Sequence, residues 1–191
     1  MNTEITYDYK AMWSAFCKQS GIRDKDYDSW AFGDESDALA ALVLEGKKRS
    51  TASVYDLYAY DNEELPEAGS YSVILDSEDR AVCVIRDTEV RIVPFKDVDE
   101  EHARLEGEGD LSLTYWRNVH RKCFTQWMKE AGMAFKDSTR IVLEKFEVVY
   151  RPYFFRARST ACSTYCERLI SRTPATSKHL FTGTRTLRAL L

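Results

Sequence analysis

The sequence has no run of about 18 apolar residues, so it contains no segment long enough to cross a membrane. Its first residues, MNTEITYDYK, lack the basic start and the apolar stretch of a secretion signal. Neither a phosphate-binding P-loop nor a dinucleotide-binding glycine fingerprint occurs. We therefore expect a cytoplasmic protein whose 191 residues form one domain, or one domain with an appendage.

Residues that typically bind metal ions are few and poorly spaced. The three histidines lie at no spacing typical of a metal site, and Cys162 and Cys166 have only His179 near them. The five cysteines are an odd number, and the first three lie far apart within apolar segments, so we expect reduced thiols. The sequence thus predicts no metal site and no cofactor.

Charge is distributed unevenly along the chain. Residues 151–191 contain eight Lys and Arg and one Glu, a net charge of +7, whereas residues 1–150 contain 19 basic and 30 acidic residues, a net charge of −11. This difference divides the chain into a domain, 1–150, and a basic tail, 151–191, which has no apolar period. We expect the tail to be disordered or loosely packed. The alternative is an arm that neutralises nucleic-acid phosphates.

Residues 1–150 mix helical and strand patterns, which predicts an α+β fold. Ser36 is the expected cap of a helix that ends at Gly46. Together the elements suggest a small curled sheet or barrel with helices packed outside it. Apolar spacing predicts helices over 9–20, 36–45, 98–105 and 112–131, and strands over 51–58, 71–75, 82–86, 88–95 and 140–150.

The segment 45–53, Glu-Gly-Lys-Lys-Arg-Ser-Thr-Ala-Ser, lies where a helix ends and a strand begins. Lys48 and Thr51 are three residues apart, and a lysine close to a threonine can act as its base if the pKa of the lysine is lowered. Burial, or the neighbouring cations Lys47 and Arg49, could lower it. The alternative is that the three adjacent cations form a solvated surface.

The segment 106–110, Glu-Gly-Glu-Gly-Asp, alternates carboxylates with glycines just before a helix. Glycine permits the close approach of a ligand, and one carboxylate could orient the lysine or move a proton. The alternative is an acidic loop whose Asp110 favours the helix N-terminus. Trp30, Phe32 and Tyr115 could stack on a nucleobase, or could instead fill the core.

Several segments, taken in order, resemble the ASCH (activating signal cointegrator homology) domain, a relative of the PUA RNA-binding fold, and in particular the longer bacterial ASCH proteins. The resemblance spans about residues 5–150 and implies a PUA-like β-barrel flanked by helices, with a cleft suited to a nucleobase or an RNA segment. The segments that carry it are Trp30-x-Phe-Gly33, 37–44, 46–53, 69–75, 93–98, 101–120 and 146–150.

The resemblance also implies a reaction. A small bacterial member of the family removes the acetyl group from N4-acetylcytidine with a lysine, a threonine three residues later and a glutamate, at whose positions Lys48, Thr51 and Glu106 stand here. Neutral Lys48 would take the proton of Thr51, whose oxygen attacks the amide carbonyl, while Glu106 orients the lysine. The family pattern usually continues to an arginine two residues after the threonine, where this sequence has Ser53.

The expected partner is therefore a modified nucleoside or single-stranded RNA, and not a membrane. An RNA-binding protein or ribonuclease, as other family members are, is the alternative to an amidohydrolase, and a third possibility is an interaction module with a vestigial cleft. The net charge of residues 1–150 favours a single nucleoside or flipped-out base over broad RNA coating, because like charges repel. The expected substrate-binding residues are Trp30, Phe32, Arg49, Ser53 and Tyr115.

Overall fold

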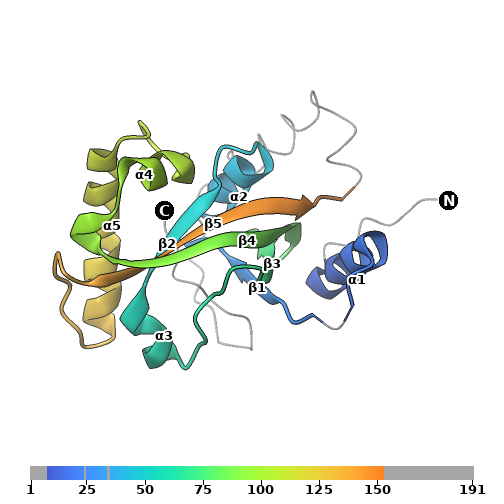
Figure 1. Ribbon diagram of the computed structural model, residues 1–191, viewed down its shortest axis with the longest axis horizontal. Coiled ribbons are helices and arrows are strands. Elements are labelled where there is room, and N and C mark those ends of the chain that lie inside the picture. The colour runs from blue at the N-terminus through green and yellow to red at the C-terminus, as the bar shows by residue number, and fades with distance from the viewer. Residues whose placement is uncertain (1–7, 24, 34, 153–191) are drawn as a thin grey trace.

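The computed structural model describes residues 8–23, 25–33 and 35–152 of the chain (Figure 1). The predicted basic tail lies, from residue 153 on, outside the described residues. The strands are β1 (Asp28–Ala31), β2 (Ser50–Val54), β3 (Tyr71–Leu75), β4 (Ala81–Pro94) and β5 (Arg140–Tyr150). The helices are α1 (Tyr9–Ser20), α2 (Ser36–Leu44), α3 (Tyr55–Asp61), α4 (Glu100–Glu106) and α5 (Leu113–Glu130), with a 3-10 turn, Phe95–Asp97, before α4.

The strands form one sheet in the order β1-β3-β4-β5-β2. β1 runs parallel to β3, and all other neighbours are antiparallel. The register of β4 against β5 shifts after Val84 and again between Asp87 and Glu89. Such bulges bend a strand and increase its twist, and the sheet curls into an open half-barrel (Figure 1). The predicted α+β class, a small curled sheet flanked by helices, is confirmed.

Both faces of the sheet are covered at β2 and β5. Successive side chains of a strand point to opposite faces. Ala52 and Leu143 pack in one apolar cluster with residues of α4 and α5, whereas Val142 and Phe146 pack in another with residues of α2 and β1. A third cluster joins α1 to β3 and β4. The segment between α2 and β2 therefore lies between the first two of these clusters.

Helix ends follow the signals in the sequence. Asp8 caps α1 by accepting the amide N–H of Ala11 at 2.8 Å, and Gly21, at φ 75°, ends that helix. Ser112 caps α5 in the same way, because its hydroxyl accepts the amide N–H of Tyr115 at 3.0 Å. The helices predicted over 9–20 and 112–131 and the strands predicted over 71–75 and 140–150 are confirmed within one residue at each end.

The strand predicted over 51–58 is wrong in its second half. The chain leaves β2 after Val54 and forms α3, although Tyr55 and Tyr58 are residues that favour strands. The hydroxyl groups of Tyr58 and Ser53 are 2.8 Å apart, so a tertiary hydrogen bond joins the helix to the strand. Here the tertiary contacts of α3 override the preference of its tyrosines for a strand.

Two further predictions are corrected. The strands predicted over 82–86 and 88–95 are one continuous strand, β4, and a bulge lies where a break was expected. Ser36 does not cap α2, because its hydroxyl donates to the carbonyl oxygens of Phe32 at 2.5 Å and Gly33 at 2.8 Å. The short edge strand β1 was not predicted.

Candidate active site

Lys48 is a buried cation in the segment between α2 and β2. It is 1% exposed, although Lys47 and Arg49 on either side of it are exposed. Two backbone hydrogen bonds fix this turn, because the amide N–H groups of Lys47 and Lys48 both donate to the carbonyl oxygen of Leu42, at 2.9 and 3.1 Å. A buried ammonium is costly unless it is paired and hydrogen-bonded. Lys48 therefore requires buried acidic partners.

Two glutamates supply these partners from the end of α4 and the loop that follows. Glu108 Oε1 lies 2.6 Å from Lys48 Nζ, and Glu106 Oε2 lies 3.2 Å from it. The side chain of Glu106 is 1% exposed and that of Glu108 is 11% exposed. Gly107, between them, has φ 75°, a conformation that favours glycine. This turn directs both carboxylates towards the same ammonium.

The other carboxylate oxygen of Glu106 is held by donors from α4 and α5. Trp116 Nε1 donates to Oε1 at 2.8 Å, and His102 Nε2 lies 3.0 Å from the same oxygen. Burial alone would raise the pKa of Glu106, but the charge of Lys48 and the hydrogen bond from His102 hold it well below its usual range. Glu106 is therefore an ionised carboxylate.

His120 supports this arrangement from one turn further along α5. Its ring stacks on the ring of Trp116, with centroids 3.8 Å apart. Nδ1 lies 2.9 Å from the carbonyl oxygen of Trp116, which can only accept, so the hydrogen is on Nδ1. Burial lowers the pKa of His120, although Glu106 opposes this shift. His120 is thus a neutral ring that fixes the orientation of Trp116.

The charges around Lys48 do not cancel when all groups are ionised, because one ammonium faces two carboxylates. Burial would lower the pKa of Lys48, but Glu106 and Glu108 raise it above its usual value. Burial raises the pKa of Glu108 to about 7, with Lys48 opposing this shift and Glu106 adding to it. Near neutral pH the cluster therefore contains an ammonium, a carboxylate and an exchangeable proton on Glu108.

The expected influence of the neighbouring cations on Lys48 is wrong in direction. Lys47 and Arg49 point outwards, and Lys47 Nζ forms an ion pair with Glu45 Oε2 at 2.7 Å. The groups that lie against Lys48 Nζ are acidic, so they favour its charged form. The resting lysine is an ammonium and must lose a proton before it can act as a base.

Thr51 lies in β2 and is 1% exposed. It stands opposite Glu144 of β5, on the face of the sheet that α2 covers. No described residue forms a hydrogen bond with its Oγ1, so the hydroxyl is bonded neither to Lys48 nor to Glu106. The structure joins Lys48 to Glu106 and leaves the Thr51 hydroxyl buried, without a hydrogen-bond partner in the described part of the chain.

Two of the aromatic residues expected to bind substrate lie in the core. Trp30 is 2% exposed and Phe32 is 1% exposed, and their rings meet edge to face with centroids 4.9 Å apart. Lys48 Nζ lies 5.3 Å from the centroid of the Phe32 ring, within the range of a cation–π contact. Phe32 therefore forms one wall of the Lys48 site, and neither ring presents a stacking surface to solvent.

Ser53 and Tyr115, also expected to bind substrate, differ in their surroundings. Ser53 is buried, and its hydroxyl pairs with that of Tyr58. Tyr115 is 38% exposed, and its ring packs so closely over Gly109 that a Cβ there would overlap the ring. Of the two, Tyr115 is the one that a ligand outside the protein can reach.

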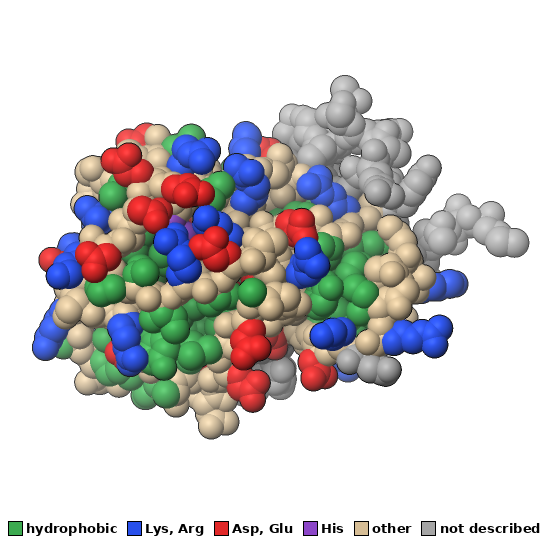
Figure 2. Space-filling view, in the orientation of Figure 1, with side chains coloured by type: hydrophobic (Ala, Val, Ile, Leu, Met, Phe, Trp, Pro, Cys, Tyr) green, Lys and Arg blue, Asp and Glu red, His purple; other side chains and the backbone are tan. Residues whose placement is uncertain are grey.

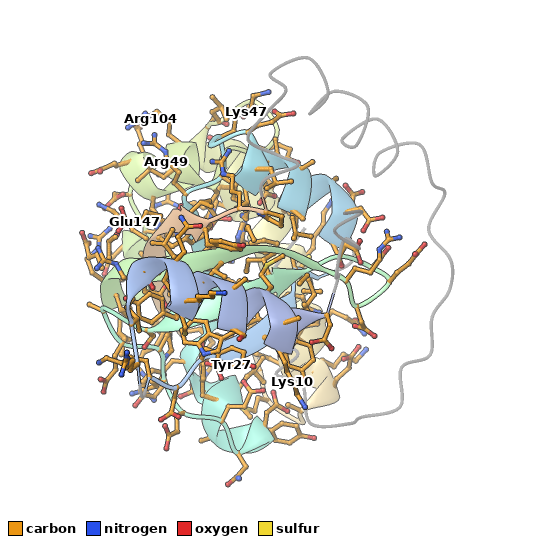
Figure 3. All side chains as sticks on the ribbon, turned by 90° about the vertical axis from the view of Figure 1, so that its right-hand side faces the viewer. Lys10, Tyr27, Lys47, Arg49, Arg104 and Glu147 are labelled. Carbon is orange, nitrogen blue, oxygen red and sulfur yellow. The ribbon has the colours of Figure 1, made fainter. Side chains whose placement is uncertain are left out.

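Arg49 is exposed at the end of the molecule that carries α4. Its amide N–H donates to the carbonyl oxygen of Leu105 at 2.7 Å, which brings this backbone beside that helix. Figure 3 shows Arg49, Arg104 and Lys47 at this end of the molecule. Acidic and basic side chains are intermixed over α4 and α2 (Figure 2). The surface around the site is therefore not uniformly basic.

Sequence reasoning missed the roles of Glu108, His102 and His120. His102 and Glu106 are four residues apart, the spacing at which helical side chains meet, and this signal could have paired them. Glu108 lies between two glycines in a segment without periodicity, so nothing in the sequence besides its carboxylate indicates a role for it. The number of charged groups that share the buried cluster cannot be read from the sequence.

Metal-binding clusters and membrane-spanning helices are both absent from residues 8–23, 25–33 and 35–152. These residues contain no group of three or more His, Cys, Asp or Glu that could hold a metal ion. None of their helices combines the length and the apolar character needed to cross a membrane. Cys17, Cys83 and Cys123 form no disulfide with one another, while Cys162 and Cys166 lie outside the described residues.

Known proteins share this architecture. The family model of the ASCH domain matches residues 28–150, which include every residue of the candidate site. The crystal structure of an ASCH domain from Lactobacillus crispatus JV V101 is 29% identical, with a TM-score of 0.68 over 75% of this chain and 94% of that one. A crystal structure of a protein from Enterococcus faecalis V583 is 32% identical, with a TM-score of 0.68 over 73% of this chain and 86% of that one. No curated protein matches the chain.

Proposed function

Because the chain belongs to the ASCH domain family, a PUA-like family associated with RNA, we propose that it is an amidohydrolase acting on an N4-acylated cytidine. Lys48, Thr51 and Glu106 are the catalytic residues of this proposal. The observation that carries it is the buried Lys48 ammonium, held between two glutamates and three residues before a buried hydroxyl. Titratable groups that burial and a specific charge partner perturb together are typical of functional sites.

The reaction is an acyl transfer through Thr51. The Thr51 oxygen attacks the carbonyl carbon of the amide, and its proton passes to the neutral amine of Lys48. The C–N bond then breaks, Lys48 gives the proton to the departing N4 nitrogen, and the acyl group remains on Thr51 as an ester. Water then attacks the ester with Lys48 as its base, which releases a carboxylic acid and restores the hydroxyl. Glu106 orients Lys48 and stabilises its charged form.

The surroundings of Thr51 support this assignment. A buried hydroxyl without a hydrogen bond costs about 1 to 3 kcal/mol, and an apolar side chain of the same shape would avoid that cost. The described residues offer Oγ1 no hydrogen bond. The hydroxyl therefore remains available to a bound substrate.

The decisive experiment incubates the full chain with N4-acetylcytidine and measures released cytidine and acetate by mass spectrometry. We expect release by the wild type, and none by Thr51→Val or Lys48→Met. The matched controls Thr88→Val and Lys47→Met make the same changes at exposed positions and retain activity. Release of cytidine that persists in Thr51→Val would exclude Thr51 as the nucleophile, and no release by the wild type would contradict the proposal as a whole.

RNA binding, with or without strand cleavage, is a second candidate function, favoured by two exposed arginines near the site. Arg49 and Arg104 lie at the same end of the molecule, and the backbone bond from Arg49 to Leu105 brings the two segments together. Guanidinium groups at such positions are suited to the phosphates of a single strand. The buried lysine plays no part in this function, because its side chain is not exposed.

This second function is tested by measuring the affinity for a short single-stranded RNA at several salt concentrations. Each phosphate contact contributes about 0.7 to the slope of log affinity against log salt. The double variant Arg49→Ala/Arg104→Ala should therefore lower that slope by about 1.4. Arg23→Ala/Lys25→Ala, which removes two exposed cations beyond the end of α1, is the control. A slope that is the same in both double variants argues against RNA contact at this end of the molecule.

A further inference from the structure

Glu108 makes the shorter of the two ion pairs of Lys48, although the proposed reaction gives it no role. Its Oε1 is 2.6 Å from Nζ, compared with 3.2 Å for Glu106 Oε2. The side chain of Lys48 is 0% exposed and that of Glu106 is 1% exposed, whereas that of Glu108 is 11% exposed. Of these three groups, Glu108 is the one that exchanges protons with solvent most readily.

The two glutamates are not equivalent acceptors of a proton. Glu106 receives hydrogen bonds on Oε1 from Trp116 and His102, and its Oε2 faces the ammonium. Protonation of Glu106 would give up these charge-assisted bonds. Within the described part of the chain, the Glu108 carboxylate accepts a hydrogen bond from Lys48 and lacks the further donors that hold Glu106, so the excess proton of the cluster belongs on Glu108.

Other charged and titratable groups face Glu108 from several elements. Lys48 lies before β2, Glu106 ends α4, Glu35 precedes α2 and Tyr115 lies on α5. Burial, followed by the charges of Glu106 and Glu35, raises the pKa of Glu108 to about 7, while Lys48 opposes the shift. Glu108 therefore changes its protonation state near neutral pH, in a range where Glu106 stays ionised.

We propose that Glu108 accepts the proton that Lys48 must lose, along the contact between Nζ and Oε1. An N–H bond of the ammonium breaks and an O–H bond forms, which leaves a neutral amine beside Glu106 and a carboxylic acid on Glu108. No other reactant is needed. Both products are uncharged, and burial favours the uncharged form of each group, so the entry of a substrate that displaces water favours the transfer. This inference rests on the proposed function, because the neutral amine is the base for Thr51.

Glu108 accepts a proton only while it is ionised, which makes the reaction dependent on pH. Hydrolysis should rise with pH to a midpoint near 7 and level off above it. Glu108→Gln should lose the midpoint and about 100-fold or more of kcat/KM, and Glu108→Asp should recover part of this loss. Glu35→Gln removes a negative charge that faces Glu108, so it should move the midpoint to lower pH without changing the activity at the plateau.

The test combines these pH profiles for N4-acetylcytidine with carbon-13 NMR of the Glu108 carboxyl in the wild type and in Glu35→Gln. The NMR measurement needs no activity, and we expect a midpoint near 7 that Glu35→Gln lowers. A carboxyl that titrates at the ordinary value of about 4.3 overturns the proposal, as does wild-type activity with an unchanged midpoint in Glu108→Gln. If the wild type releases no cytidine while the carboxyl titrates near neutrality, the amidohydrolase fails and the proton exchange is supported.

Discussion

Gly107 lies directly against the carbonyl group of Lys47: a Cβ at Gly107 would come within 2.7 Å of both the carbonyl carbon and the oxygen. This contact joins the turn between the two glutamates to the segment that carries Lys48. The backbone bond from the Arg49 amide N–H to the Leu105 carbonyl oxygen, at 2.7 Å, joins the same two segments. Because both contacts are made by main-chain atoms, neither can be relieved by a change of rotamer.

Substitution of Gly107 by alanine should therefore disturb the site and the fold together. The left-handed conformation costs a residue with a Cβ about 1 to 2 kcal/mol, and the clash with Lys47 adds to it. We expect the free energy of unfolding, measured in urea, to fall by more than about 2 kcal/mol. Hydrolysis of N4-acetylcytidine should fall as well, because Glu106 and Glu108 move relative to Lys48.

Gly46→Ala is the matched control for this substitution. Gly46 has nearly the same positive φ, 74°, but a Cβ there meets nothing within 4 Å. The free energy of unfolding of Gly46→Ala should therefore fall only by the conformational cost, about 1 to 2 kcal/mol. Equal losses of stability in Gly46→Ala and Gly107→Ala would show that the close approach to Lys47 is not energetically important.

Elements with strong periodicity were predictable from the sequence. The apolar residues of α1 and α5 recur at helical spacing between a capping side chain and a terminal glycine or turn, and both helices form where this pattern lies. The segment Tyr55–Asp61 was not predictable from local preferences, because its tyrosines favour strands. A hydrogen bond between Tyr58 and Ser53, together with burial, holds it as a helix.

The candidate site was predictable only in part. Family resemblance paired Lys48 with Glu106, and the structure brings these two side chains into contact. The direction predicted for the pKa of Lys48 was wrong, because the adjacent cations are visible in the sequence whereas the contact with an acid 60 residues away is not. Which charged groups are buried together depends on how α4 packs against the end of α2, and the local sequence does not specify this tertiary contact.

The stability of the protein should fall as the pH rises towards neutrality because of Glu108. Its pKa is raised to about 7 in the folded protein, so the folded state binds this proton more tightly than the unfolded chain does. The stabilisation is complete below the ordinary glutamate pKa of about 4.3 and is lost as the pH rises to about 7. We expect Glu108→Gln, which cannot release a proton, to remove up to about 4 kcal/mol of this decline.

Unfolding in urea at several pH values between about 4.5 and 7.5 measures this decline, and the comparison of variant with wild type isolates the contribution of Glu108. Glu147→Gln is the control, because Glu147 is half exposed and pairs with Arg86 at the surface. A decline that is the same in the wild type and in Glu108→Gln would show that Glu108 keeps its ordinary protonation.

Thr51→Val should be neutral or stabilising although the residue is buried. The hydroxyl has no hydrogen bond to a described residue, so its removal loses nothing and relieves a desolvation cost of about 1 to 3 kcal/mol. Thr139→Val is the matched control, because the buried Thr139 Oγ1 accepts the amide N–H of Lys136 at 2.9 Å. Loss of that bond should cost about 1 kcal/mol. If Thr51→Val lowers the urea midpoint as much as Thr139→Val does, the Thr51 hydroxyl has a partner that stabilises the fold.

Trp116→Phe should destabilise the protein by more than the loss of ring area. Trp116 Nε1 donates to the ionised Glu106 at 2.8 Å, and a hydrogen bond to a charged group contributes about 1.5 to 3 kcal/mol. Trp30→Phe is the matched control, because the buried Trp30 Nε1 has no hydrogen-bond partner in the described part of the chain. At neutral pH we expect Trp116→Phe to cost more than Trp30→Phe by this amount.

The dependence of that difference on pH identifies its origin. The low pKa of Glu106 stabilises the fold above the ordinary glutamate pKa of about 4.3, and this stabilisation is lost as the pH falls through the folded-state value. Loss of the Trp116 donor raises the pKa of Glu106 in the folded protein and so reduces that stabilisation. The extra cost of Trp116→Phe should therefore be complete at neutral pH and shrink in acid. Equal losses in the two variants at every pH would mean that Trp116 contributes only its packing.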